Sequence, residues 1–127
     1  MLKGLKTFYL LVLTLIMLTT ISYSERLAPK DVEPVVYNGV KYSALHWGYK
    51  HGLGQNGGVI EASNVKSGKR LWLLKVYTIH YIKDLETDVQ DIFITTLKIE
   101  NGDLIVTNEK NKKYKVSLST KKITPLD

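Results

Sequence analysis

Short runs rich in β-branched and aromatic residues, separated by turn-forming residues, dominate the chain after its first two dozen residues. Asn38-Gly39 separates two such runs, and this dipeptide is a strong hairpin signal because both turn positions need a positive φ. Tyr114, Val116 and Leu118 alternate with polar residues, which is the pattern of a half-buried strand. No helical period appears in this part of the chain, so the sequence predicts an all-β fold.

About seven strands are expected, and tight turns between them predict an antiparallel meander. They cover residues 35–37, 40–44, 59–64, 70–82, 89–99, 104–107 and 114–118. The run 70–82 is apolar on both faces, so we expect it to be central or to bend at a bulge and change the layer it serves. Apolar faces must meet, which predicts a small sandwich or a partly open barrel.

The first 24 residues have the layout of a secretory signal peptide. Lys3 and Lys6 precede an apolar run over residues 8–18, and serines occupy the −3 and −1 positions before Glu25. The alternative is an uncleaved membrane anchor, but the whole apolar stretch of 15 residues is shorter than the roughly 20 that span a bilayer. We therefore expect a signal peptide over residues 1–24 and no stable membrane insertion after its cleavage.

The remaining 103 of the 127 residues (127 − 24) suffice for one domain with one ordinary core, which we place at residues 25–127. The chain contains no cysteine, so disulfides cannot stabilise it in an oxidising compartment. Export without cysteine is typical of a bacterial envelope protein, periplasmic or secreted. The net charge of +6 falls to +4 without Lys3 and Lys6, an excess that predicts no specific binding to nucleic acid.

Lysines are concentrated near the carboxyl end of the chain, at positions 110, 112, 113, 115, 121 and 122. This concentration would be explained if the lysines lie in turns and keep exposed strand edges from pairing with other chains. The alternative is electrostatic attachment to an anionic polymer, which would weaken as the salt concentration rises.

Residues 62–72 carry a hairpin motif with a polar residue at Asn64, a turn glycine at Gly68 and an aromatic residue at Trp72. The motif resembles the blade motif of pyrroloquinoline-quinone-type β-propellers, with Asn64 and Ser67 replacing the usual Asp and Thr. A weaker echo at residues 116–122 lacks the glycine and the tryptophan. A closed propeller needs at least four blades, so the resemblance does not imply quinone chemistry. The whole chain also resembles small exported bacterial proteins of unknown function, which implies no activity.

Residues 46–58 form the one sizeable irregular segment, with five glycines in 13 positions. A strand follows this segment instead of a helix, so it is not a phosphate-binding loop. Its glycines favour a compact loop packed by its own side chains. Glycine and aromatic residues concentrated outside the strands predict a recognition surface. The candidate ligand-binding residues are His46, Trp47, Tyr49, His51, Gln55 and Asn56.

No motif in the chain specifies a reaction: there is no Gly-x-Ser-x-Gly elbow and no cofactor fingerprint. A metal site needs three or four converging ligands, and only His46 and His51 are close in sequence. Asp84, Glu86 and Asp88 alternate, but the glycine and the closing glutamate of a calcium loop are missing. We therefore expect no catalytic residue, no cofactor and no metal.

The sequence thus predicts a non-enzymatic module that binds an envelope macromolecule or a small ligand through the segment 46–58. The alternative is a small envelope enzyme or metal-binding protein that uses His46 and His51. The identity of the ligand, the strand order and the oligomeric state stay open at this point.

Overall fold

The structure, a computed structural model, describes residues 26–127 and consists of eight strands and one short 3-10 helix. The elements are β1 (Val35–Tyr37), β2 (Val40–Leu45), η1 (Gly48–His51), β3 (Val59–Asn64), β4 (Arg70–Lys75), β5 (Ile94–Glu100), β6 (Asp103–Asn108), β7 (Lys113–Val116) and β8 (Ile123–Leu126). The predicted signal peptide lies outside the described residues. Within residues 26–127, no helix is both long enough and apolar enough to cross a membrane.

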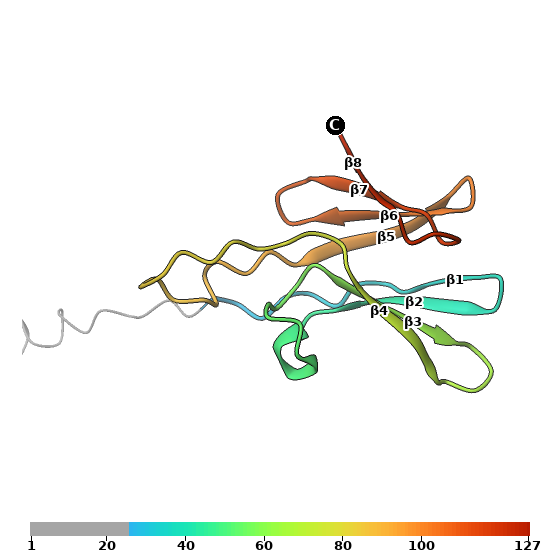
Figure 1. The fold of residues 1–127 in the computed structure, drawn as a ribbon, viewed down its shortest axis with the longest axis horizontal. Coiled ribbons are helices and arrows are strands. Elements are labelled where there is room, and N and C mark those ends of the chain that lie inside the picture. Colours follow the sequence, from blue (N-terminus) through green and yellow to red (C-terminus); the bar gives the residue numbers. More distant parts are fainter. Residues whose placement is uncertain (1–25) are drawn as a thin grey trace, which may run out of the picture.

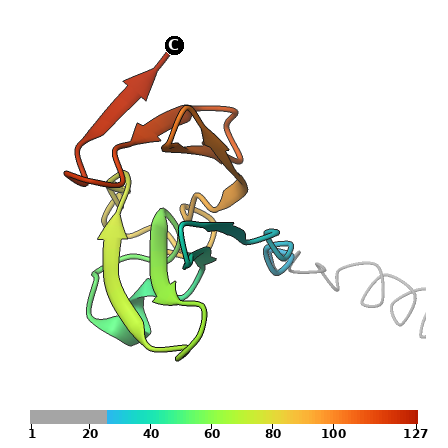
Figure 2. The same cartoon turned by 90° about the vertical axis from the view of Figure 1, so that its right-hand side faces the viewer.

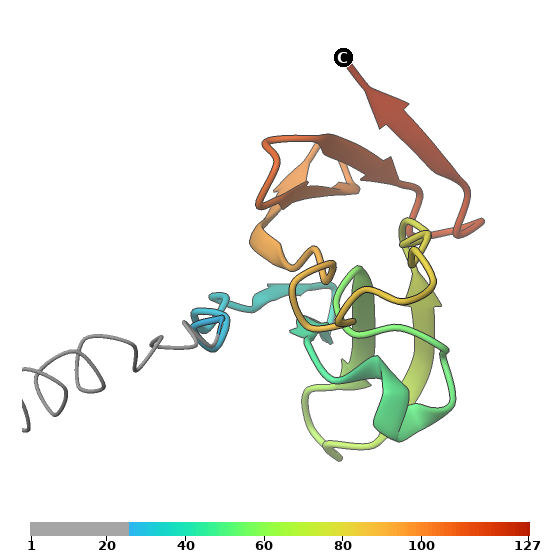
Figure 3. The same cartoon turned by 90° about the vertical axis from the view of Figure 1, so that its left-hand side faces the viewer.

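The strands form two four-stranded antiparallel meanders, β1-β2-β3-β4 and β5-β6-β7-β8, each in sequence order. Figure 1 shows the second sheet lying over the first, and Figures 2 and 3 show the two layers from either end. β1 and β2 contact β5, so the sheets meet most closely on that side. The predicted all-β sandwich is confirmed, with eight strands where about seven were expected.

The core lies between the sheets because alternate residues of each strand point inward. Its buried members are Tyr42, Ile60, Ala62, Val76, Ile94, Leu97, Leu104, Val106 and Val116. Each large aliphatic side chain buried in this way contributes about 1.5–3 kcal/mol to folding.

The tight turns follow the predicted backbone chemistry. Asn38 and Gly39 have φ of 50° and 75°, and the same pair of conformations recurs at Asn101 and Gly102, with φ of 50° and 79°. Both residues in each turn therefore have the positive φ of a two-residue hairpin turn that matches the strand twist.

The β3–β4 hairpin is held by the residues of the blade-like motif. The Asn64 side-chain oxygen accepts hydrogen bonds from the backbone N–H groups of Lys66 and Ser67, both at 2.9 Å, and Gly68 has φ of 71°. Trp72 packs on Tyr42 with ring centroids 5.9 Å apart, and the Lys121 ammonium lies 5.0 Å from the Trp72 ring. The motif therefore stabilises a turn and joins the two sheets locally.

Two predicted strands are shorter than expected. The run 70–82 leaves its sheet after Lys75, and the run 89–99 joins the second sheet only at Ile94. Between them, residues 76–93 form an irregular segment that passes from one layer to the other (Figure 1). Strand pairing stops because the Gln55 side chain, instead of a neighbouring strand, hydrogen-bonds the backbone of Tyr77 and Ile79.

Candidate functional site

The segment 46–58 folds into a compact loop at one end of the sandwich, beside the segment 76–93 (Figure 1). The Gly57 N–H donates to the His46 carbonyl oxygen at 2.8 Å, which closes the loop. Gly48 lies so close to the Gln55 backbone that a Cβ at this position would collide with its carbonyl oxygen. Gly52, with φ of 72°, ends η1. The loop is compact, as predicted, but Trp47 and Tyr49 do not fill it: their rings pack on Phe93 and Tyr81 outside the loop.

Gln55 lies inside the protein and is 1% exposed. Its side-chain amide donates to the carbonyl oxygens of Gly57 at 3.1 Å and Tyr77 at 2.9 Å, and accepts from the Ile79 N–H at 2.9 Å. Both N–H donors and the oxygen acceptor of the amide thus bond to backbone groups that take no part in strand pairing. Gln55 therefore joins the loop to the segment 76–93 and presents nothing to a ligand.

Asn56 belongs to a second polar network with Tyr81 and the buried Asp91. The Tyr81 hydroxyl donates to Asp91 Oδ1 at 2.5 Å and accepts from the Asn56 N–H at 3.2 Å, while Asn56 Nδ2 lies 3.5 Å from Asp91 Oδ2. Asn56 Oδ1 also accepts from the Tyr49 N–H at 3.3 Å. Burial raises the pKa of Tyr81, and its hydrogen bond to Asp91 raises that pKa further. Asn56 thus holds the loop backbone in place.

The His46 side chain supports the loop through contacts with two residues outside it. Its Nε2 lies 3.0 Å from the Lys30 carbonyl oxygen, so Nε2 carries the hydrogen in this contact, and its ring packs edge-on against Phe93. Nδ1 is buried without a hydrogen-bond partner among the described residues. His51 is exposed on η1. Within residues 26–127 no three metal-ligating side chains gather, so the structure gives His46 and His51 no third ligand.

Two aromatic rings of the loop face solvent on one side and pack against the protein on the other. Trp47 is 45% exposed and its ring lies 5.9 Å from that of Phe93, while Tyr49 is 46% exposed and its ring lies 6.1 Å from that of Tyr81. His51, on the same short helix as Tyr49, is also exposed. We call Trp47, Tyr49 and His51 the aromatic face.

Arg26 connects the amino-terminal end of the described chain to this region, a role that sequence reasoning missed. Its guanidinium lies 4.8 Å from the Phe93 ring, pairs with Glu109 at 2.5 Å and donates to the carbonyl oxygens of Asp88, at 3.0 Å, and Asp91. Glu109 also accepts from the Phe93 N–H at 3.1 Å. No local pattern signals a pair that is 83 positions apart in sequence.

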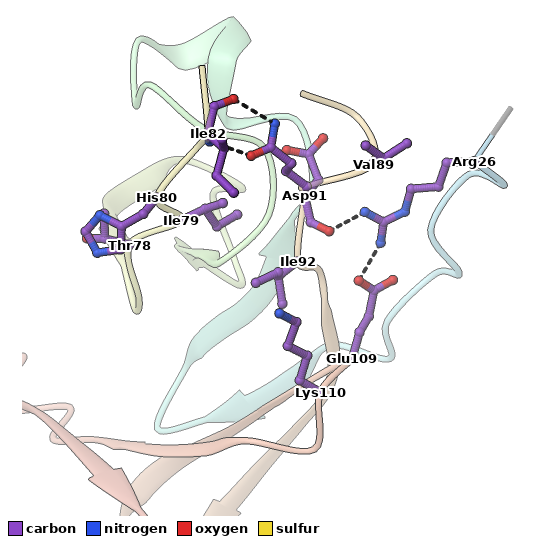
Figure 4. A pocket seen from close by; sticks show the side chains of 11 residues that line it. Arg26, Thr78, Ile79, His80, Ile82, Val89, Asp91, Ile92, Glu109 and Lys110 are labelled. Carbon is purple, nitrogen blue, oxygen red and sulfur yellow. Dashed lines mark hydrogen bonds and ion pairs between the residues drawn. The ribbon is translucent and has the colours of Figure 1, made fainter. Parts of the chain in front are cut away.

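An open cleft of about 640 Å³ lies between the two arms of the segment 76–93, residues 78–82 and 89–92 (Figure 4). Apolar side chains of Ile79, Ile82, Val89 and Ile92 line it, and Figure 4 shows the Arg26–Glu109 pair at one side. The guanidinium is already engaged by Glu109 and by backbone carbonyls. The cleft therefore offers an apolar wall, and its arginine is bound within the protein.

The raised pKa values of the Tyr77 and Tyr81 hydroxyls predict a loss of stability at alkaline pH. Burial raises the pKa of Tyr77, and nearby Tyr114 and Glu109 add to the shift. An unfolded tyrosine loses its proton near pH 10, whereas both folded hydroxyls retain theirs above that value. The unfolded chain then binds fewer protons, so the stability is fully present below about pH 10 and falls as pH rises further.

Urea unfolding followed at a series of pH values across pH 10 measures this fall. Tyr77→Phe removes the hydroxyl that donates to the Ile92 carbonyl oxygen at 2.7 Å, so the variant should lose about 1 kcal/mol at neutral pH. Above pH 10 its stability should decline less steeply than that of the wild type. Equal slopes for the two proteins would contradict the assignment.

Comparisons of this chain with protein-family models and with curated proteins found no match.

Proposed function

We propose that this protein is an exported, non-enzymatic binding module that contacts its partner through the aromatic face. The observation that carries this proposal is the pair of half-exposed rings, Trp47 and Tyr49, each fixed from behind by another aromatic ring. Tryptophan and tyrosine dominate binding energies at interfaces because they bury large areas with few rotatable bonds. Export enters the proposal through the signal-peptide layout of residues 1–24.

Preorganisation of the loop supports the same proposal. Binding is weakened when a loop must be ordered, and a loop that is already held in place avoids this cost. Gln55 holds the loop from its buried side, and the Asn56–Tyr81–Asp91 network holds the loop backbone at Asn56. Gln55, Asn56 and His46 therefore act as supports, and the contact residues narrow to Trp47, Tyr49 and His51.

Site-specific crosslinking in the natural host tests this proposal. A photo-crosslinking residue at position 51 should capture a partner, and the same probe in a Trp47→Ala, Tyr49→Ala background should capture at least about tenfold less, since each truncation costs on the order of 1–2 kcal/mol of binding. Circular dichroism would establish that the double variant is folded.

The matched control is the same probe at Val65, which is 48% exposed in the β3–β4 turn at the far end of the sandwich (Figure 1). Equal capture from positions 51 and 65, or capture that is unaffected by the double substitution, would reject the aromatic face as the contact surface.

A further inference from the structure

The tip of the segment 76–93, which we define as residues 82–89, exposes three aliphatic side chains. Ile82 is 64% exposed, Leu85 54% and Val89 58%. Half of the ten large hydrophobic side chains that are exposed within residues 26–127 lie either in this tip or in the aromatic face. Single exposed apolar residues are ordinary on a protein surface, but a concentration of them is typical of a surface that another molecule covers.

The Gln90 side chain fixes the shape of the tip. Its oxygen accepts a hydrogen bond from the Ile82 N–H, and its nitrogen lies 3.1–3.3 Å from the carbonyl oxygens of Ile82, Leu85 and Glu86. One amide therefore bonds the backbone at both ends of the turn, while the Leu85 side chain stays exposed. Little order has to be created in the tip when a partner binds.

The tip is negatively charged, unlike the chain as a whole. Asp84, Glu86 and Asp88 are exposed, and within residues 26–127 none of these three carboxylates forms an ion pair. Together with Lys83 they give the tip a formal charge of −2 (1 − 3), in a chain with a net charge of +6. Unpaired carboxylates around apolar side chains favour a basic partner and disfavour an anionic lipid surface.

The cleft between the two arms of the segment 76–93 adjoins the tip. Figure 4 shows Ile82 and Val89 at one end of this cleft and Lys110 at the other, and the buried Ile79 lines it between them. The acidic residues of the tip lie between Ile82 and Val89 in sequence, so they belong to the end of the cleft away from Lys110. An apolar side chain that fills a pocket with polar groups around it is the usual arrangement of a binding hot spot.

We infer that the tip and the cleft bind a basic segment of a partner protein. An apolar side chain of the segment enters the cleft, and lysine or arginine residues next to it pair with Asp84, Glu86 and Asp88. The inference rests on the proposed function in one respect, namely that the domain binds a partner at this end. Tyr49 of the aromatic face packs on Tyr81, the residue before Ile82, so one partner can reach both surfaces.

Photo-crosslinking from position 85 in the natural host tests the inference. The probe should capture the same protein as the probe at position 51, and mass spectrometry of the crosslinked peptide should find lysine or arginine beside an apolar residue. Asp84→Asn, Glu86→Gln and Asp88→Asn together should lower the capture at least about tenfold, because opposite charges steer association.

The matched control removes three acidic charges from the second sheet and its end, by the substitutions Glu100→Gln, Asp103→Asn and Asp127→Asn. This variant has the same net charge as the tip variant and should leave the capture unchanged. Ile82→Ser and Val89→Ser together test the cleft without changing any charge. Both residues are largely exposed, so the domain should stay folded, which circular dichroism checks, while the capture should fall about tenfold.

Capture from position 51 without capture from position 85 would overturn this inference and leave the aromatic face as the contact surface. No capture from either position would reject both. The inference is also overturned if position 85 captures a lipid, a second copy of the chain or an acidic segment. Unchanged capture in the tip variant or in the cleft variant would have the same consequence.

Discussion

Replacing Gln55 with alanine is expected to lower the free energy of unfolding by about 3 kcal/mol, although the substitution touches no strand. The side chain satisfies the carbonyl oxygens of Gly57 and Tyr77 and the N–H of Ile79, in a place that is almost fully buried. Each polar group left buried without a partner costs about 1–3 kcal/mol. A midpoint of thermal unfolding lowered by more than about 10 °C would follow for a domain of this size.

The matched control for this prediction is Gln90→Ala. The Gln90 amide also bonds several backbone groups, the N–H and carbonyl of Ile82 and the carbonyls of Leu85 and Glu86, but these contacts are exposed. Water can replace an exposed partner, so the loss should stay below about 1 kcal/mol. Equal losses in the two variants, measured by urea unfolding, would show that the buried amide does not hold the loop.

Gly57→Ala is expected to be the most damaging glycine substitution in the loop, with a loss of roughly 3 kcal/mol or more. Gly57 has φ of 78°, and a Cβ at this position would collide with the Ile92 carbonyl oxygen and approach the Phe93 ring to 3.1 Å. Neither the Gly57 backbone nor the Ile92 backbone can rotate out of the way as a side chain could. The collision can therefore be relieved only if the loop moves away from the segment 76–93. The aromatic face would then lose its support.

Gly54→Ala separates the steric contribution from the conformational one. Gly54 has φ of 71°, nearly the same as Gly57, but a Cβ there meets no atom within 4 Å. Only the cost of a left-handed conformation remains, about 1 kcal/mol. Chemical denaturation of the two variants side by side measures the difference, and similar stabilities would mean that the close approach to Ile92 is unimportant.

Local sequence patterns predicted the elements whose hydrogen bonds are local. The Asn38-Gly39 hairpin turn, the turn held by Asn64 and Gly68, and the compact glycine-rich loop each depend on residues only a few positions apart. β8 was missed because Pro125 weakens the strand signal, yet a proline is compatible with a strand when its missing N–H faces an open edge.

The length of the strand 70–82 and the roles of the candidate residues depended on distant partners. Tyr77, Ile79 and Tyr81 have the composition of a strand, and only the docking of Gln55 and Asn56 against them shows why pairing ends at Lys75. Residue type and spacing identified the loop but did not distinguish a glutamine that faces a ligand from one that faces the core.

Alternation of apolar residues and positive φ are properties of neighbouring residues, so the all-β class, the tight turns and the unusual loop could be predicted from the sequence alone. The tertiary structure decided that Gln55, Asn56 and His46 support the loop while Trp47 and Tyr49 face solvent. It also decided that Pro125 lies in a strand at the outer edge of its sheet. The physical reason is that a polar group can be satisfied by any suitable partner, and only the packing of distant segments determines which partner is within reach.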